Sequence, residues 1–489
     1  MTFNKMKKQN FQLRDFLILS AILLLAFVFR LYKINTPLAD LHSWRQADTA
    51  AVARNFIKDG INLFQPRYDD LSGRESGREN PQGYRMVEFP LYNAIFALIY
   101  KLAPVISIEV YGRLTTVIFS LLIIGIIYYL MFKESGRLAA VVASLTYAIY
   151  PFFVFFSRVV LPETTALAFA MISILFLYFS NEKKIMPIKE SIYITASFIF
   201  FALAILIKPT VIFYSIVLLY LFFQKYHFKF FKKIDFYLYF IAAFLPFALW
   251  RLYIRNFPEG IPVSDWLITS VNTYQGLKNI FFRPAFFRWI FFERINNIIF
   301  GGYLTLFFVL GVLKKNQKIF LHTFLLSNLL YIFTFQGGNV QHEYYQTLLL
   351  PTLAIFVGLG VQLFFQIKKN LLPLIVSIPI VIALFVLSFY FSFYRVRDYY
   401  NFPQDLTQIA KIIKTLSKSS DKIVTDTTGD STLLYLTDRK GAPSLYKDPP
   451  TLQTLGYNYM IIFNKDYAKE LKESFSPVFE NDKFIMFKL

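Results

Sequence analysis

Apolar runs long enough to cross a lipid bilayer constrain this sequence more than any other feature. Three of them are "DFLILSAILLLAFVFRLY" (15–32), "TTVIFSLLIIGIIYYLMF" (115–132) and "LLPLIVSIPIVIALFVLSFYFSFY" (371–394). Each approaches or exceeds the roughly 18–20 residues that a helix needs to span a bilayer core, where backbone groups must bond to one another. The sequence therefore predicts an α-helical polytopic membrane protein. Because no small-residue cleavage site follows the first run, we expect a retained anchor and not a signal peptide.

The distribution of charge predicts how the chain crosses the membrane. Short basic connectors separate the apolar runs and fall on one side if the spans alternate, which is the positive-inside pattern of cytoplasmic loops. The pattern places the N-terminus in the cytoplasm and the C-terminus outside, and it accounts for the net charge of +20 without a nucleic-acid partner. We expect about eleven transmembrane helices, at 14–32, 112–132, 138–156, 163–180, 191–207, 209–223, 236–253, 296–313, 319–335, 346–366 and 371–393.

The remaining segments predict two domains. Residues 1–394 are expected to form the transmembrane domain, with a large first outer loop at 33–111 and a second outward segment at 254–295. Residues 395–489 alternate short β-rich runs with polar helical stretches, which predicts a small extracytoplasmic α/β domain. The apolar stretch 88–104 is too short to span, so we expect it to lie as a helix along the membrane surface.

Residue usage excludes several kinds of site. The chain has no cysteine, which excludes disulfides, thiolate catalysis and Cys-ligated metals. Its four histidines are dispersed, so no metal and no other cofactor is expected. No Gly-rich nucleotide-binding loop occurs, and the two halves show no inverted repeat, which weakens a secondary-transporter interpretation.

The first outer loop opens with a polar stretch, "DLHSWRQADTAAVARNF" (40–56). Ser43 followed by Gln46 matches a capping box. Gly60 is a suitable C-terminal stop, so the pattern predicts a helix over 44–58. The amides at its N-terminus favour negative charge, from a carboxylate or from the phosphate of a ligand.

Three charged residues surround the start of this helix. Arg45 and Asp48 are three residues apart and are expected to pair on the helix surface. Asp40 lies before the first turn, and it is either a proton acceptor in a reaction or a loop carboxylate that orders the start of the helix.

Further ionisable residues recur at the outer ends of spans, where they are energetically costly. Arg158 and Glu163 flank a proline between two spans, and Lys208 is the lone charge in a long apolar stretch. Cations at the outer face, near an outer-loop carboxylate, suit a lipid whose phosphate head lies at the interface and carries a group to be transferred. A sugar on a polyprenyl phosphate fits this position better than a nucleotide sugar.

A late span opens with three ring-bearing residues in "HEYYQTLLLP". Tyrosines at span ends are usually interfacial anchors, which is the simpler interpretation of Tyr344 and Tyr345. The alternative is that Tyr345 and His342, with His42 of the first loop, orient a substrate.

These pieces together resemble glycosyltransferase family 39, the protein-mannosyltransferase and aminoarabinose-transferase group of the C-type membrane glycosyltransferases. The resemblance implies the C-type fold and a metal-independent, inverting transfer from a polyprenyl-monophosphate sugar, with an outer-loop carboxylate as base. The matching segments are Asp40 before "HSWRQADTAAVARNF", "EFPLYNAIFALIYKL" (88–102), "GRLTTVIFSLLIIGIIYYL" (112–130), "SRVVLPETTALAF" (157–169), "LIKPT" (206–210) and "HEYYQTLLLPTLAIFVGLG" (342–360).

One departure from the family leaves the base open. Many relatives have an adjacent Asp-Glu pair at the helix start, where this chain has Arg45 and Gln46. The base is therefore Asp40 or Asp48, with Asp40 preferred. The expected roles are catalytic for Asp40, Asp48 and Glu88, donor-phosphate binding for Arg45, Arg158 and Lys208, and substrate orientation for His42, Glu163, His342 and Tyr345.

The expected function is sugar transfer on the outer face of a bacterial plasma membrane. The expected partners are the bilayer, a polyprenyl-phosphate sugar and an acceptor hydroxyl on a glycan, lipid or protein. One alternative is a transporter or flippase of lipid-linked sugars, which would place its charges near mid-membrane. Another is an O-antigen ligase or polymerase, whose large outer loop usually comes late in the chain.

Overall fold

Helices dominate the computed structural model, which describes residues 11–182, 185–263, 283–315, 319–367 and 373–489. Residues 264–282 of the expected outward segment and parts of several basic connectors lie outside these ranges. In chain order the α-helices before the C-terminal domain are α1 (Leu13–Arg30), α2 (Ser43–Asp59), α3 (Leu91–Leu102), α4 (Ile108–Ser135), α5 (Arg137–Ile149), α6 (Pro151–Phe156), α7 (Glu163–Ser180), α8 (Pro187–Ile207), α9 (Ser215–Tyr226), α10 (Ile234–Tyr253), α12 (Pro284–Phe287), α13 (Leu304–Leu313), α14 (Phe320–Thr334), α15 (Gln336–Gln341), α16 (Leu350–Ile367) and α17 (Leu374–Val396). Three shorter 3-10 or π elements matter below: η1 (Pro209–Tyr214), η5 (Arg288–Ile299) and η6 (Glu343–Leu349).

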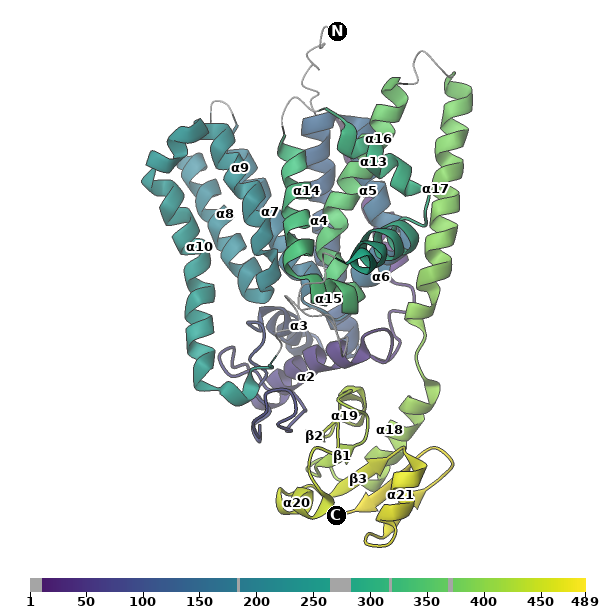
Figure 1. The fold of residues 1–489 in the computed structure, drawn as a ribbon. Coiled ribbons are helices and arrows are strands. Elements are labelled where there is room, and N and C mark those ends of the chain that lie inside the picture. The colour runs from purple at the N-terminus through teal and green to yellow at the C-terminus, as the bar shows by residue number, and fades with distance from the viewer. Residues whose placement is uncertain (1–10, 183–184, 264–282, 316–318, 368–372) are drawn as a thin grey trace.

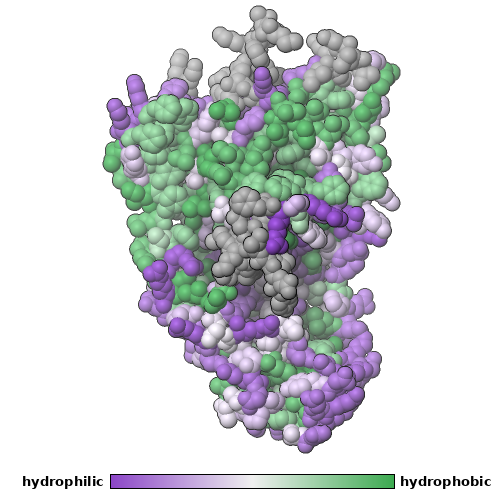
Figure 2. Space-filling view, viewed as in Figure 1, coloured by the Kyte–Doolittle hydropathy of each residue, from purple (hydrophilic) through white to green (hydrophobic). Residues whose placement is uncertain are grey.

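The helices confirm a multi-pass membrane protein. Within the described residues, seven helical segments are long and apolar enough to cross a membrane, and an eighth results if one bent pair counts as a span. Each of the eleven expected spans falls on helical structure, although α1, α5 and α14 are shorter or more charged than the seven. Figure 2 shows hydrophobic surface over the helical bundle and hydrophilic surface over the C-terminal domain.

The span expected over 296–313 is not one straight helix. The segment from Pro284 to Ile299 and the helix α13 meet at an angle of 119°. Gly301 and Gly302 lie at the break with φ of 56° and 85°, values that glycine adopts without the steric cost of a side chain. An apolar run shows that a segment is buried in lipid or protein, but it does not show where the backbone turns.

Two glycines let α13 and α16 approach closely. A Cβ added to Gly360 would lie 1.6 Å from the carbonyl oxygen of Phe307, and one added to Gly311 would lie 1.9 Å from that of Phe356. Small residues at such contacts are a common means of helix association in membranes, where the hydrophobic effect does not drive helices together.

Helices α2 and α3 lie between one end of the bundle and the C-terminal domain (Figure 1). The stretch 88–104 does contain a helix, α3, whose Leu98 and Leu102 side chains are exposed. Its position along a membrane surface stays a prediction.

The tail folds into the expected α/β domain. Its five strands lie in the order β2-β1-β3-β5-β4, with β1 parallel to β2 and β3, and β5 antiparallel to β3 and β4. The strands are β1 (Ile423–Thr425), β2 (Gly441–Ala442), β3 (Tyr459–Ile462), β4 (Pro477–Glu480) and β5 (Ile485–Lys488), and the helices are α18 (Gln404–Leu416), α19 (Thr432–Thr437), α20 (Pro449–Thr454) and α21 (Lys465–Leu471).

The first outer loop joins this sheet at its β2 edge. The amide of Leu71 donates to the carbonyl of Gly441 at 2.6 Å, and the amide of Gly441 donates to the carbonyl of Asp69 at 2.9 Å. Helix α19 also contacts α2, where the Thr432 hydroxyl bonds to that of Ser43 at 2.9 Å. The loop and the C-terminal domain therefore form one connected structure over the end of the bundle.

Candidate active site

Helix α2 forms where the sequence predicts a helix, but it begins differently. His42 is the N-cap, in the left-handed conformation with φ 57°, and its side chain makes no capping bond. The predicted capping box is wrong, because the Gln46 side chain bonds to other groups. Its amide donates to Asp40 at 2.6 Å, and its side-chain oxygen accepts from the amide of Val160 at 3.1 Å. The predicted stop at Gly60, with φ 92°, is confirmed.

Asp40 is enclosed between two arginines. Arg158 donates to its carboxylate at 2.9 Å, and Arg113 lies 3.5 Å from the same oxygen. All three side chains have an exposed fraction of 0%. Arg158 also donates to the carbonyls of Tyr32 and Lys33, each at 2.8 Å. The structure brings Asp40 and Arg158 together as expected, but as a buried ion pair that fixes the end of α1 against the turn between α6 and α7.

Four charged residues meet at the end of the bundle next to the C-terminal domain, and we call Arg45, Glu88, Glu163 and Lys208 the charge cluster. Glu88 accepts from Arg45 at 2.5 Å and from Lys208 at 2.9 Å, and Lys208 lies 2.7 Å from Glu163. They come from α2, the segment before α3, the first residue of α7 and the end of α8. The amide of Phe89 bonds to the carbonyl of Leu206 at 3.0 Å, which holds Glu88 beside Lys208.

Within the charge cluster, ion pairing keeps Glu88 and Arg45 ionised. Burial alone raises the pKa of Glu88, but Arg45 and Lys208 beside it bring that pKa well below its usual range. Burial likewise lowers the pKa of Arg45, and the carboxylate of Glu88 more than offsets this. The cluster thus holds two cations and two carboxylates in a mostly buried site.

Histidine and tyrosine rings lie against the charge cluster. The ring of His342 stacks on Tyr344 with centroids 5.3 Å apart, and Lys208 Nζ lies 5.5 Å from the ring centre of Tyr345. Both tyrosines are buried, so the prediction that they are interfacial anchors is wrong. His42 bonds to Glu343 at 2.8 Å. The structure therefore brings His42, His342 and Tyr345 to the same side of the cluster.

Asp48 faces the C-terminal domain. It does not pair with Arg45 as predicted, because Arg85 lies 3.0 Å from its carboxylate and the Ser431 hydroxyl donates to it at 2.6 Å. Burial raises the pKa of Asp48 to about 6, against the opposing effect of Arg85. Asp48 also lines a small hollow with Arg45, Glu88 and Arg85, so its carboxylate lies beside the charge cluster.

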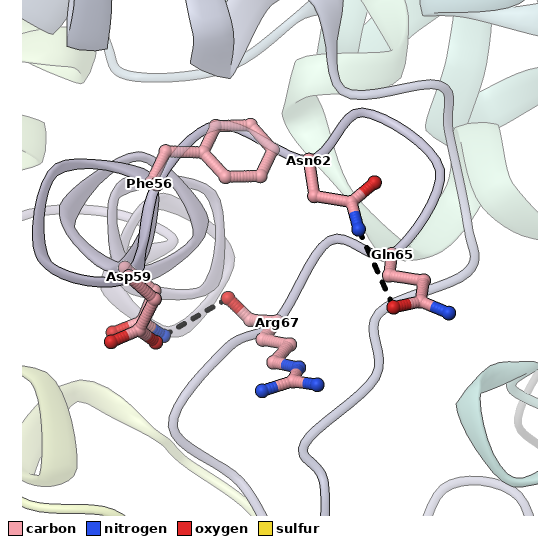
Figure 3. Close-up of a pocket in the computed structure, with 7 residues that line it drawn as sticks. Phe56, Asp59, Asn62, Gln65 and Arg67 are labelled. Carbon is pink, nitrogen blue, oxygen red and sulfur yellow. Dashed lines mark hydrogen bonds between the residues drawn. The ribbon is translucent and has the colours of Figure 1, made fainter.

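Another hollow, shown in Figure 3, lies at the far end of α2. Phe56, Asp59, Asn62 and Gln65 line it, together with Arg67, whose carbonyl accepts from Asn55 at 3.0 Å. The lining residues that the structure describes include none of the predicted site residues. We therefore assign no part of the site to this hollow.

Sequence reasoning missed several partners of the predicted residues. Arg113 was open to prediction, because an arginine at the outer start of an apolar span is costly unless it is paired. Glu343, next to His342, pairs with Arg294 of η5 as well as with His42. Arg85 and Ser431 carry no comparable signal, because their roles depend on how the loop and the tail fold together.

The family resemblance is confirmed by comparison. The sequence model of the dolichyl-phosphate-mannose-protein mannosyltransferase family matches residues 87–250. This range contains Glu88, Arg158, Glu163 and Lys208 and ends before the C-terminal domain. A sequence comparison with curated proteins gave no match.

Solved structures confirm the fold. The crystal structure of ArnT from Cupriavidus metallidurans bound to undecaprenyl phosphate matches with a TM-score of 0.65 and 12% identity, over 97% of each chain. The Archaeoglobus fulgidus oligosaccharyltransferase matches with a TM-score of 0.58 and 12% identity, over 95% of this chain and 72% of that one. The arabinofuranosyltransferase AftD from Mycobacteria matches with a TM-score of 0.54 and 12% identity, over 99% of this chain and 42% of that one. The protein therefore has the fold of the C-type membrane glycosyltransferases.

Proposed function

We propose that the protein is a glycosyltransferase that moves a sugar from a polyprenyl monophosphate to an acceptor hydroxyl on the outer face of a bacterial plasma membrane. The observation that carries the proposal is the charge cluster, in which Arg45 and Lys208 converge on Glu88 at 2.5 and 2.9 Å. It lies at the end of the bundle next to the C-terminal domain, where a lipid phosphate would reside. A flippase would need such charges along the depth of the membrane.

In this proposal the two cations bind the donor phosphate. Arg45 and Lys208 both bind the Glu88 carboxylate, and the donor phosphate takes the place of that carboxylate between them. As the bond from the anomeric carbon to the phosphate oxygen breaks, negative charge grows on the departing polyprenyl phosphate. Fixed cations in a site with little water stabilise that charge more than water would, which lowers the barrier to transfer. Glu163 keeps Lys208 in place.

Asp48 is the base in this mechanism. It takes the proton of the acceptor hydroxyl as the new bond to the anomeric carbon forms. A pKa of about 6, raised by burial, leaves Asp48 ionised and basic near neutral pH, as general bases require. Glu88 is a weaker base because its two cations lower its pKa. Asp40 is enclosed by Arg113 and Arg158, which leaves it a structural role.

The remaining predicted residues complete the proposal. His42, His342 and Tyr345 line the side of the charge cluster and orient the sugar. No metal and no other cofactor is required, and the N-terminus lies in the cytoplasm. Two relatives support the lipid donor: the ArnT structure contains undecaprenyl phosphate, and an Archaeoglobus fulgidus oligosaccharyltransferase was solved with dolichol phosphate and an inhibitory peptide.

The test measures binding of undecaprenyl phosphate to the purified full-length protein in lipid nanodiscs. Lys208→Met should weaken binding by about tenfold or more, because a charge-assisted hydrogen bond contributes roughly 1.5–3 kcal/mol. Lys101→Met is the matched control, because Lys101 is exposed on α3 and should leave binding unchanged. Unchanged binding in Lys208→Met, together with full transfer by Asp48→Asn from a lipid-linked sugar, would overturn the proposal.

A further inference from the structure

A cleft lies between the first outer loop and the C-terminal domain, which are joined at the β2 edge. Its volume is about 370 Å³, within the roughly 300–1,000 Å³ of typical ligand pockets. Trp44, Asp70, Arg74 and Glu75 line it from the loop, and the turn 427–430 lines it from the C-terminal domain. None of these residues has a part in holding the donor phosphate.

Asp70 is the most unusual group in the cleft. Asp70 is only 3% exposed, and its carboxylate accepts a hydrogen bond from the backbone amide of Ser72 at 2.7 Å. Among the described residues no lysine or arginine forms an ion pair with it. Burial raises the pKa of Asp70 to about 7. A buried carboxylate without a cation costs stability, so its presence in the wall of a cleft indicates a binding role.

The other walls carry the groups that recognise carbohydrate. Trp44 is half-buried and offers an apolar ring surface. Asp70, Asp430 and Thr427 offer oxygen atoms that accept or exchange hydrogen bonds with hydroxyl groups. One aromatic face with a few convergent polar groups is a typical small-molecule site. Three carboxylates line the cleft against one arginine, Arg74, so an anionic ligand would be repelled.

The cleft is connected to the proposed reaction site. Glu75 in its wall pairs with Arg85, and Arg85 lies 3.0 Å from Asp48. The ring of Trp44 lies 5.8 Å from that of His342, which stacks beside the charge cluster. Two residues that line the cleft, Trp44 and Glu75, therefore contact groups that surround the proposed reaction site.

We propose that this cleft binds the acceptor, and that the acceptor is a carbohydrate that is neutral or carries amino groups. The acceptor role rests on the proposed function, but carbohydrate binding in the cleft does not. Trp44 supports one sugar ring, and Asp70 and Asp430 accept its hydroxyl or ammonium hydrogens. The C-terminal domain thus supplies one wall of the acceptor site.

The test uses ligand-observed NMR to measure the binding of three oligosaccharides to the full-length protein in nanodiscs, without any lipid donor. The probes are cellotriose, which is neutral, chitosan trisaccharide, which is cationic, and trigalacturonate, which is anionic. We expect cellotriose or chitosan trisaccharide to bind and trigalacturonate to bind at least about tenfold more weakly, a difference of about 1.4 kcal/mol.

Variants locate the binding site. Asp70→Asn and Trp44→Ala should each weaken the favoured oligosaccharide by about tenfold, as expected for a lost hydrogen bond to a charged group or a lost ring contact. Asp482→Asn is the control, because Asp482 is exposed in the turn between β4 and β5, at the sheet edge opposite β2, and this variant should bind like wild type. The thermal unfolding midpoint identifies a variant that has lost its fold, in which case Asp430→Asn replaces it.

Two results would overturn the inference: trigalacturonate binding as tightly as the other two, or binding that all the cleft variants leave unchanged. Absence of binding by all three probes would overturn it as well. The undecaprenyl-phosphate measurement with Lys208→Met is independent, so failure of the donor proposal is distinguishable from failure of this one.

Discussion

Replacing Asp40 by asparagine separates a structural role from a chemical one. The Asp40 carboxylate accepts from Arg158 at 2.9 Å and from Gln46 at 2.6 Å, and Arg113 lies at 3.5 Å. Asparagine keeps one acceptor oxygen but removes the negative charge, which leaves two fully buried arginines without their counter-ion. Breaking a buried ion pair from one side costs about 3–5 kcal/mol, and we expect the lower end because hydrogen bonds are partly retained.

The assay is thermal unfolding of the detergent-solubilised full-length protein, alongside sugar transfer by the same sample. Asp40→Asn should lower the unfolding midpoint clearly, and it should lose transfer in proportion to the loss of folded protein. Asp59→Asn is the control, because Asp59 is exposed at the end of α2, the helix that follows Asp40, and this variant should unfold like wild type. An Asp40→Asn protein that unfolds at the wild-type temperature but transfers no sugar would refute this reasoning and restore Asp40 as the base.

Three further predictions follow from the same structure. The rate of transfer by the wild type should rise as pH increases through about 6, where Asp48 loses its proton, and a flat profile from pH 5 to 8 would contradict this. Asp48→Asn should slow transfer by about 10²–10⁴-fold. Burial holds the pKa of Asp70 near 7 in the folded protein, so the stability that this group contributes at low pH is lost as pH rises through 7. The unfolding free energy of Asp70→Asn relative to wild type should therefore be higher at pH 8 than at pH 5, by up to about 3 kcal/mol in denaturant titrations, and the same relative value at both pH values would be inconsistent with this. Gly360→Ala should lower the unfolding midpoint by the equivalent of about 1–3 kcal/mol, because the added Cβ would lie 1.6 Å from the Phe307 carbonyl oxygen. In the control Gly125→Ala the added Cβ meets no atom within 4 Å, so equal midpoints for the two variants would argue against tight α13–α16 packing.

The apolar pattern predicted the helical bundle well because it depends on local composition. Helix α2, helix α3 and the α/β tail all appeared where short-range patterns placed them. The capping box failed for a physical reason: the Gln46 side chain is bonded to Asp40, six residues before it, and to the amide of Val160, which is distant in the sequence. The bend at Gly301 and Gly302 was also not predicted, because both arms are apolar.

The candidate site was predictable in its membership but not in its pairings. Lys208, Glu163, Glu88 and Arg45 were each suggested by charge at a span end or in the outer loop. Their convergence joins four separate segments of the chain, and the distances between those segments cannot be read from the sequence. The expected pairing of Arg45 with Asp48 gave way to partners from the loop residue Arg85 and the tail residue Ser431. A short-range rule cannot anticipate competition from residues that arrive by folding.

The pairing of residues 69–71 with the β2 edge has a consequence for biogenesis. The loop is synthesised early, directly after α1, whereas β2 is synthesised near the end. In the proposed topology, the loop would cross the membrane behind α1. The segment that pairs with the β2 edge would then be on the same side of the membrane before that edge is synthesised. Contacts between distant parts of a chain form slowly, and an unpaired sheet edge is prone to association with other chains. Early translocation of the loop would shorten the time that this edge stays unpaired, so the order of synthesis would help to protect the last domain from aggregation.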